Sequence, residues 1–134
     1  MSISQISPQD SWKILRKDNN SILIDVRTKE ELIFTGEADL SEAAAKYVAL
    51  PWRSYPGMEI NHSFTGDLIT FINKAFPNTK PEQIKLLFLC RSGVRSNEAA
   101  NHISNLNYEC YNIINGFEGA IGGWKAENLP WKQN

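Results

Sequence analysis

The chain has 134 residues, of which 42% are hydrophobic and 22% are charged. This composition predicts one globular domain (residues 1–134) and excludes a disordered chain. The formal net charge of −1 gives no overall field that would attract nucleic acid or an anionic membrane, so neither is expected as a partner. Two cysteines cannot form a disulfide framework, and no residues have zinc-ligand spacing.

The start of the chain and its apolar stretches bear on the expected cellular compartment. Residues 1–5 lack the basic region and the apolar run of a secretory signal, and no stretch approaches the length of a membrane span. Because free thiols persist in a reducing compartment, we expect a cytoplasmic protein.

Helices and short strands alternate from the start of the chain. Ser7 and the proline after it mark a helix that ends at the turn 18–20. The apolar, mostly β-branched run 22–26 predicts a central strand buried on both faces. Thr28, with a glutamate three residues later, opens a brief helix through a capping box. Residues 36–46 either extend a helix or form a loose insertion.

The middle of the chain adds a strand, a loop and a long helix. Residues 48–50 predict a short strand closed by a proline. The aromatic loop 52–58 has two equally weighted interpretations, a surface turn over the core edge or a wall of a pocket. Apolar residues recur every three or four positions over 64–76, which predicts a helix with one apolar face. His62, just before it, is interpreted as a capping or surface residue.

The last third predicts strands over 86–89 and 108–114, a helix from Ser96 to about residue 105, and a short helix over 117–124. Cys110 is interpreted as a packed residue of the last strand, and His102 as a solvated residue. The alternation predicts an α/β fold with a mainly parallel sheet of about five strands and helices on both faces. In such sheets ligands bind at the carboxyl ends of the strands.

A cysteine-containing turn lies at that position. It reads Cys90, Arg91, Ser92, Gly93, Val94, Arg95 and Ser96. Backbone N–H groups of such a turn can form an anion-binding nest, to which a helix N-terminus adds partial positive charge. A cysteine at a strand end is often only a small buried hydrophobe, but a structural turn has no need of two arginines. The sequence therefore predicts a nucleophilic sulfur in a small cationic cup.

Asp25 and Arg27 end the first buried strand and are interpreted mainly as supporting residues. Asp25 is expected to accept neighbouring backbone N–H groups. Arg27 is expected to brace the structure by pairing with Glu30 or Glu31. Because strand ends gather at the ligand side, a place for Arg27 at the mouth of the site, steering an anion, is the alternative.

Several stretches together resemble the rhodanese (thiosulfate sulfurtransferase) homology domain in a single copy. These are residues 24–27 with 30–31, the turn 90–96, the glycine-rich segment 115–124, and Leu129 with Pro130. The family commonly has a Gly-His-Ile-Pro-Gly-Ala segment after its first helix, and the matching region here, from residue 36 to 52, departs from it.

The resemblance implies that Cys90 carries a sulfane sulfur as a persulfide, with no metal or organic cofactor. Backbone N–H groups from Arg91 to Arg95 would surround that persulfide, and these two arginines would hold a small anionic donor such as thiosulfate. Gly93 would allow the turn, and Ser96 would cap the following helix. The acceptor would be cyanide or a thiol, including a thioredoxin-like or sulfur-relay protein.

Two alternatives remain open at this point. A cysteine phosphatase or arsenate reductase uses a similar cradle, but its arginine comes six positions after the cysteine, where this chain has Ser96. A non-catalytic rhodanese-like interaction module is the other alternative, although such modules often lack the cysteine.

Overall fold

The computed structural model describes residues 2–133. Five strands form one sheet in the order β1 (Ser4–Ile6), β8 (Glu109–Ile113), β7 (Lys85–Leu89), β2 (Ser21–Asp25) and β4 (Lys46–Ala49). Every pair of neighbours in this sheet is parallel. The α/β fold with a central parallel sheet is therefore confirmed.

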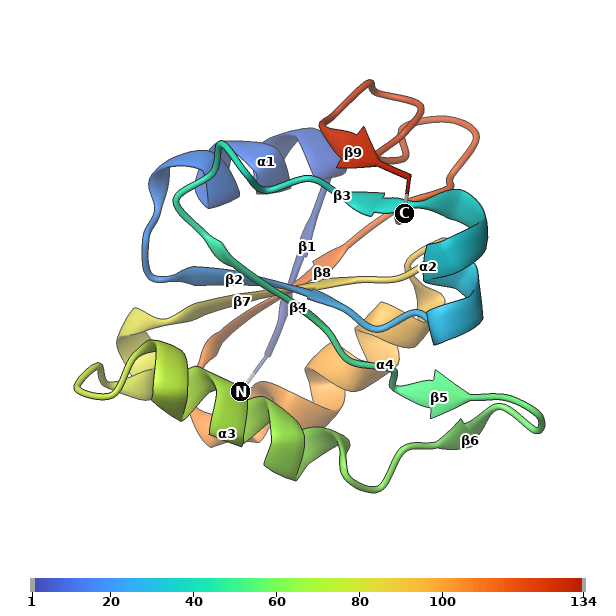
Figure 1. Cartoon of the computed structure of the whole chain (residues 1–134). Coiled ribbons are helices and arrows are strands. Elements are labelled where there is room, and N and C mark those ends of the chain that lie inside the picture. The colour runs from blue at the N-terminus through green and yellow to red at the C-terminus, as the bar shows by residue number, and fades with distance from the viewer. Residues whose placement is uncertain (1, 134) are drawn as a thin grey trace.

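Helices cover both faces of the sheet (Figure 1). On one face lies α1 (Pro8–Lys17), and on the other lie α3 (Phe64–Ala75) and α4 (Val94–Ile103). The short helix α2 (Lys29–Thr35) follows the carboxyl end of β2. Two 3-10 turns, η1 (Pro81–Gln83) and η2 (Ser104–Leu106), flank β7 and α4.

The strands are apolar on both sides because each face has its own core. Ile22 and Phe88 pack with residues of α3 and α4. Leu23 and Leu87 belong to a second cluster with Leu15 of α1 and with the carboxyl-terminal segment. All five residues of β2 are buried, and this double burial explains why its sequence is continuous rather than alternating in polarity.

Both predicted helix starts near the amino terminus are confirmed. Ser7 caps α1 by accepting the backbone N–H of Asp10. Thr28 and Glu31 form the complete capping box of α2. These caps satisfy backbone donors that an α-helix leaves without partners in its first turn.

The segment after α2 is not helical. It contains β3 (Glu37–Ala38), which pairs antiparallel with β9 (Trp131–Lys132) near the end of the chain. Residues 41–45 then form a turn followed by a bend, in which the N–H groups of Ala44 and Ala45 donate to carbonyls of α1. The insertion is therefore bound to the end of α1 and leads into β4.

The aromatic loop fulfils both of its interpretations with different residues. Trp52 is buried and packs edge-on against Phe64, so it covers the core. The loop continues through the hairpin of β5 (Arg53–Ser54) and β6 (Glu59–Ile60). Tyr55 at its tip is half exposed and lines a cavity with Arg91.

Two predictions for the last third of the chain are wrong. Helix α4 begins at Val94, two residues before Ser96, because Gly93 occupies its N-cap in a left-handed conformation. Residues 117–124 form successive turns instead of a helix. Three glycines, Gly119, Gly122 and Gly123, weaken helix formation in that segment.

None of the helices within residues 2–133 has the length and the apolar character that crossing a bilayer requires.

Candidate functional site

Cys90 lies at the carboxyl end of β7, in the centre of the sheet, and its side chain is completely buried. The Sγ atom accepts the backbone N–H of Gly93 at 3.1 Å. It also lies 3.2 Å from Oγ of Ser96. Arg91 and Ser92 are exposed on the outside of the turn. The sulfur therefore faces the inside of the turn, towards Gly93 and Ser96.

Gly93 gives the turn its shape. Its φ of +103° lies in the region that side chains disfavour. This conformation directs its N–H to Sγ and leads directly into α4. The sulfur thus lies beside the N-terminus of a ten-residue helix, where the helix dipole favours negative charge.

Ser96 lies beside the sulfur within α4 and does not cap that helix. Its side chain is buried, and its Oγ donates to Oδ1 of Asn112 at 2.5 Å. The Nδ2 of Asn112 donates to Oε1 of Gln5 at 2.8 Å and to the carbonyl of Gly93 at 3.1 Å. With both amide hydrogens used, Oδ1 faces Ser96, and the single hydroxyl proton of Ser96 points away from Sγ.

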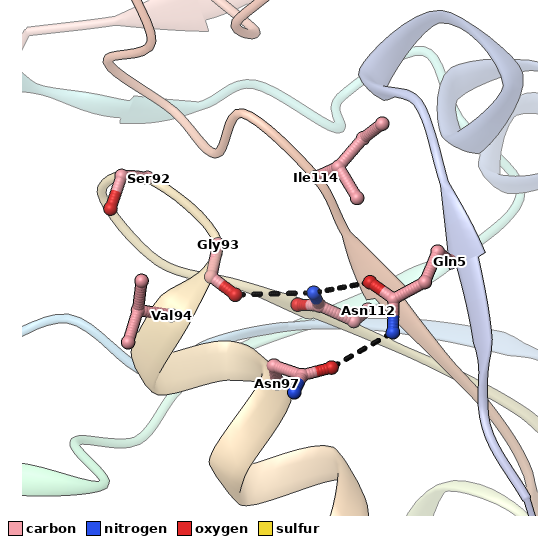
Figure 2. A pocket seen from close by; sticks show the side chains of 7 residues that line it. All are labelled: Gln5, Ser92, Gly93, Val94, Asn97, Asn112 and Ile114. Atoms are coloured by element: carbon pink, nitrogen blue, oxygen red, sulfur yellow. Dashed lines mark hydrogen bonds between the residues drawn. The ribbon is translucent and has the colours of Figure 1, made fainter.

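The polar chain continues to the surface through Gln5, whose Nε2 donates to Asn97 at 2.8 Å. These residues line a cavity of about 380 Å³ with Val94 and Ile114 (Figure 2). The sequence pattern does not indicate Asn112, Gln5 and Asn97 as residues of the site. The one local signal was a polar asparagine, Asn112, between the apolar residues Tyr111 and Ile113 of β8.

Arg95 is held by a carboxylate. Its Nη1 and Nη2 donate to the two oxygens of Glu31, both at 2.7 Å. The two side chains are only 17% and 16% exposed. Burial by itself raises the pKa of Glu31, but the hydrogen bonds from Arg95 and from the backbone of Thr28 outweigh it and lower that pKa to about 2. Glu31 is therefore ionised at neutral pH.

Arg91 is the open cation of the turn, with a side chain 68% exposed. Its Nε lies 3.9 Å from a carboxylate oxygen of Glu118. The other oxygen of Glu118 lies 3.9 Å from Nη1 of Arg27. The two arginines that the sequence predicted as joint anion ligands are thus unequal, because only Arg91 is open to solvent.

Arg27 is fully buried and does not reach the mouth of the site. Neither does it pair with Glu30 or Glu31. Its Nη2 and Nε donate to Asp25 at 2.8 and 3.0 Å, and its backbone N–H donates to the same carboxylate. An arginine two residues after a buried aspartate folds back on it, because a buried charge needs its partner close by.

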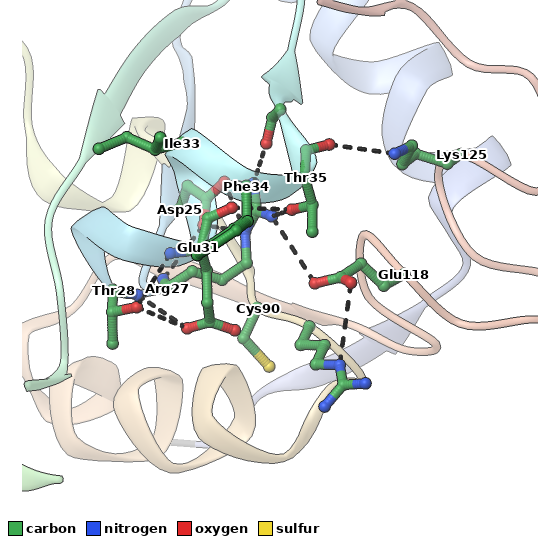
Figure 3. Close-up of polar contacts among 12 residues, drawn as sticks. Asp25, Arg27, Thr28, Glu31, Ile33, Phe34, Thr35, Cys90, Glu118 and Lys125 are labelled. Atoms are coloured by element: carbon green, nitrogen blue, oxygen red, sulfur yellow. Dashed lines mark hydrogen bonds and ion pairs between the residues drawn. The ribbon is translucent and has the colours of Figure 1, made fainter. Parts of the chain in front are cut away.

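Arg27 also connects three segments behind the site (Figure 3). It donates to Oγ1 of Thr35 and to the carbonyl of Gly36, both at the end of α2. Its guanidinium lies 4.2 Å from the ring centroid of Phe117. Asp25 and Arg27 therefore support the walls of the site from behind.

A cavity of about 360 Å³ opens beside the cysteine turn. Its lining residues are Glu30, Glu31, Phe34, Thr35, Tyr55, Arg91 and Glu118. Figure 3 shows Cys90 with Glu31 and Glu118 on either side of it in that view. Within residues 2–133, no three His, Cys, Asp or Glu side chains are grouped so that they could hold a metal ion.

Solved structures with this architecture place the chain in a known fold. A rhodanese-like domain protein from Staphylococcus aureus superposes with a TM-score of 0.62 at 17% identity, over 98% of this chain and 99% of that one. A polysulfide-sulfur transferase from Wolinella succinogenes gives 0.63 at 24%, over 98% and 80%. A possible tyrosine phosphatase from Rhodopseudomonas palustris gives 0.59 at 20%, over 97% and 85%. The fold is rhodanese-like, as predicted.

More similar relatives show the family. The protein RC0915 of Rickettsia conorii, named as uncharacterized, is 36% identical over 98% of this chain and 99% of its own. The crystal structure of Rv0390 from M. tuberculosis is 31% identical over the whole of both chains, with a TM-score of 0.81. The chain belongs to the family that these relatives define. No family model matches it.

The polar chain behind Cys90 predicts a stability effect. Replacing Asn112 with alanine leaves the Ser96 hydroxyl, the Gln5 amide and the Gly93 carbonyl without their partner. We expect the free energy of unfolding to fall by about 2 kcal/mol or more in denaturant titrations. The control is Asn101→Ala, since Asn101 is exposed and donates only within α4, and its effect should stay within about 0.5 kcal/mol. Equal effects would contradict the role given to Asn112.

The Glu31–Arg95 pair predicts a pH dependence. Because the folded-state pKa of Glu31 lies below its ordinary value of 4.5, its contribution is complete above that value and is lost as pH falls towards 2. The contribution at neutral pH is up to about 3 kcal/mol. The stability difference between wild type and Glu31→Gln should therefore be constant above about pH 5 and shrink below it. A difference that stays constant down to pH 2 would contradict this assignment.

Proposed function

We propose that this protein is a sulfurtransferase that moves a sulfane sulfur from a donor to a thiophilic acceptor through a persulfide on Cys90. The observation that carries the proposal is the position of Sγ. It lies at the carboxyl end of the central strand, at the N-terminus of α4, and accepts the N–H of Gly93.

The transfer takes place in two displacements. In the first, the Cys90 thiolate attacks the outer sulfur of the donor, an S–S bond forms, and the donor's own S–S bond breaks. Its electron pair leaves with the remainder of the donor, which is sulfite when the donor is thiosulfate. In the second, cyanide or a thiol attacks the outer sulfur of the persulfide and the Cys90 thiolate leaves. A covalent carrier of this kind divides one difficult transfer into two easier ones.

The polypeptide supports the charge that these steps place on sulfur. The Gly93 N–H and the dipole of α4 are fixed before the reaction, so their alignment needs no reorganisation during it. Because Cys90 has no exposed surface, the donor reaches Sγ when the exposed side chains of Arg91 and Ser92 move aside, while the backbone of the turn keeps its place. The cavity lined by Arg91, Glu31 and Glu118 is the approach.

Cys110 is not the second thiol of this reaction. In the register of the sheet it pairs with Leu86, four positions before Cys90 along β7, and so lies towards the opposite end of the strands. Burial, with the adjacent charge of Glu109, raises the pKa of Cys110 to about 12. It therefore stays protonated, and the acceptor comes from outside the chain.

The proposed acceptor is cyanide or a thiol, including a thiol on a thioredoxin-like or sulfur-relay protein. The proposed compartment is the cytoplasm, which keeps Cys90 reduced.

The rival phosphatase function is not favoured, because Arg95 comes five positions after Cys90 and both of its terminal nitrogens bind Glu31. A phosphate would have to displace that carboxylate.

The proposed function predicts that Cys90 gains one sulfur atom. After incubation with thiosulfate or with the methanethiosulfonate anion, intact-mass spectrometry should show one added sulfur in the wild type and in Cys110→Ser. Cys90→Ser should gain none. With cyanide added, the wild type should release thiocyanate and lose the added sulfur. A wild type that no donor loads would be a non-catalytic module, and the proposal would be wrong.

The same geometry predicts negligible phosphatase activity. Hydrolysis of an aryl phosphate by the wild type should not exceed that by Cys90→Ser in a continuous absorbance assay, since Arg95 is not available to the phosphate. Appreciable turnover that disappears in Cys90→Ser would reverse the order of the two functions.

A further inference from the structure

The charge balance beside Cys90 differs from that of a simple cationic cup. Among the residues lining the adjoining cavity, three carboxylates, Glu30, Glu31 and Glu118, face one guanidinium, that of Arg91. The cation closest to the start of α4, Arg95, has both terminal nitrogens bound to Glu31. A dianion entering this cavity therefore meets one open cation, that of Arg91, because Glu31 cancels the charge of Arg95.

Glu31 cannot easily release Arg95. Its Oε1 also accepts the backbone N–H of Thr28 at 3.0 Å and lies 3.1 Å from Oγ1 of Thr28. The carboxylate is thus part of the capping box of α2, and a movement away from Arg95 would also remove the cap. The pairing is fixed by the fold and not only by the attraction between the two charges.

The rest of the cavity is suited to an apolar group. Phe34 is 84% exposed and Tyr55 is 54% exposed, and both line the cavity. Exposed aromatic side chains beside a single guanidinium fit a donor that has one negative charge and one organic substituent. They offer little to a small, strongly hydrated dianion.

We propose that Glu31 is a specificity-determining residue. It neutralises Arg95, so that the site prefers monoanionic sulfane donors that carry an organic group over dianionic sulfane donors. This inference rests on the proposed sulfur transfer to Cys90 and concerns the donor of that reaction.

Two donors test it with the same chemistry. In thiosulfate the transferred sulfur is bonded to a sulfonate group, and in the methanethiosulfonate anion a methyl group replaces one charged oxygen. With either donor the Cys90 thiolate forms a bond to the outer sulfur and the donor's S–S bond breaks. The electron pair leaves on sulfite in one case and on methanesulfinate in the other. The two donors differ by one charge.

The measurement is the second-order rate of Cys90 persulfide formation, followed by intact mass with each donor. We compare variants by the ratio of the thiosulfate rate to the methanethiosulfonate rate, because a general change in the reactivity of Cys90 affects both rates equally and cancels. In Glu31→Gln, whose glutamine retains the capping box, we expect this ratio to rise about tenfold, as expected for releasing one partly buried cation.

The matched control is Glu30→Gln, which removes the same charge one residue away on α2 from an exposed position in the same cavity. Its ratio should change by about twofold or less, the effect of a solvent-screened charge. Adding Arg95→Met to Glu31→Gln should abolish the gain, because the double variant no longer has the released cation. Melting curves for each variant establish that it is folded.

The outcomes separate the two proposals. If neither donor loads the wild type, the sulfurtransferase function itself fails. If both donors load Cys90 but the ratio in Glu31→Gln equals that in Glu30→Gln, or the gain survives Arg95→Met, the transfer remains and the role of Glu31 is overturned.

Discussion

The buried ion pair of Asp25 and Arg27 is the interaction on which the architecture around Cys90 depends. Two charges are withdrawn from water at the end of the central strand β2. Their desolvation is tolerable because the guanidinium donates to Asp25, to Thr35 and to the carbonyl of Gly36, and lies 3.9 Å from a carboxylate oxygen of Glu118. The same side chain packs on Phe117, so it joins β2, the end of α2 and the carboxyl-terminal turn.

The carboxyl-terminal turn that contains Phe117 also fixes the cysteine turn, residues 90–96, through backbone hydrogen bonds. The N–H groups of Phe117 and Glu118 donate to the carbonyls of Cys90 and Arg91. Gly116 makes this approach possible, since a Cβ at its position would lie 2.3 Å from the Arg91 carbonyl oxygen. The turn is thus held by main-chain contacts with the carboxyl-terminal turn. It is also held by Asn112, which donates to the Gly93 carbonyl, and by its continuation into α4. The backbone of the turn is therefore bound, and among its side chains those of Arg91, Ser92 and Val94 are exposed.

The sequence predicted the features that depend on local patterns. Three features are determined within a few residues: the apolar run of β7, the capping box of α2 and the turn at Gly93. The parallel sheet follows from the alternation of strands and helices along the chain. The contacts that shape the site are not local. Glu31 contacts Arg95 across 64 positions, and Ser96 contacts Asn112 across 16. A single sequence does not show that residues so far apart in the chain are in contact.

The two wrong helix predictions, at Ser96 and over residues 117–124, have a common physical cause. A serine near a helix start suggests a cap, and an apolar run with a tryptophan suggests a helix, but tertiary contacts decide otherwise in both cases. Ser96 is drawn inside α4 by the buried partners Cys90 and Asn112. Residues 117–124 remain as turns, in which the N–H of Trp124 donates to the Gly116 carbonyl. The burial of Arg27 follows the same logic, because its nearest carboxylate is inside the sheet.

The bond between Asn112 and Gln5 has a practical consequence for handling the protein. Gln5 belongs to β1, an edge strand of three residues that pairs on one side only, with β8. Cys90 is therefore connected to the edge of the sheet through three side chains, Ser96, Asn112 and Gln5. An affinity tag or fusion partner joined ahead of this strand would have to leave its pairing undisturbed, and a carboxyl-terminal attachment beyond β9 keeps the added mass away from that connection.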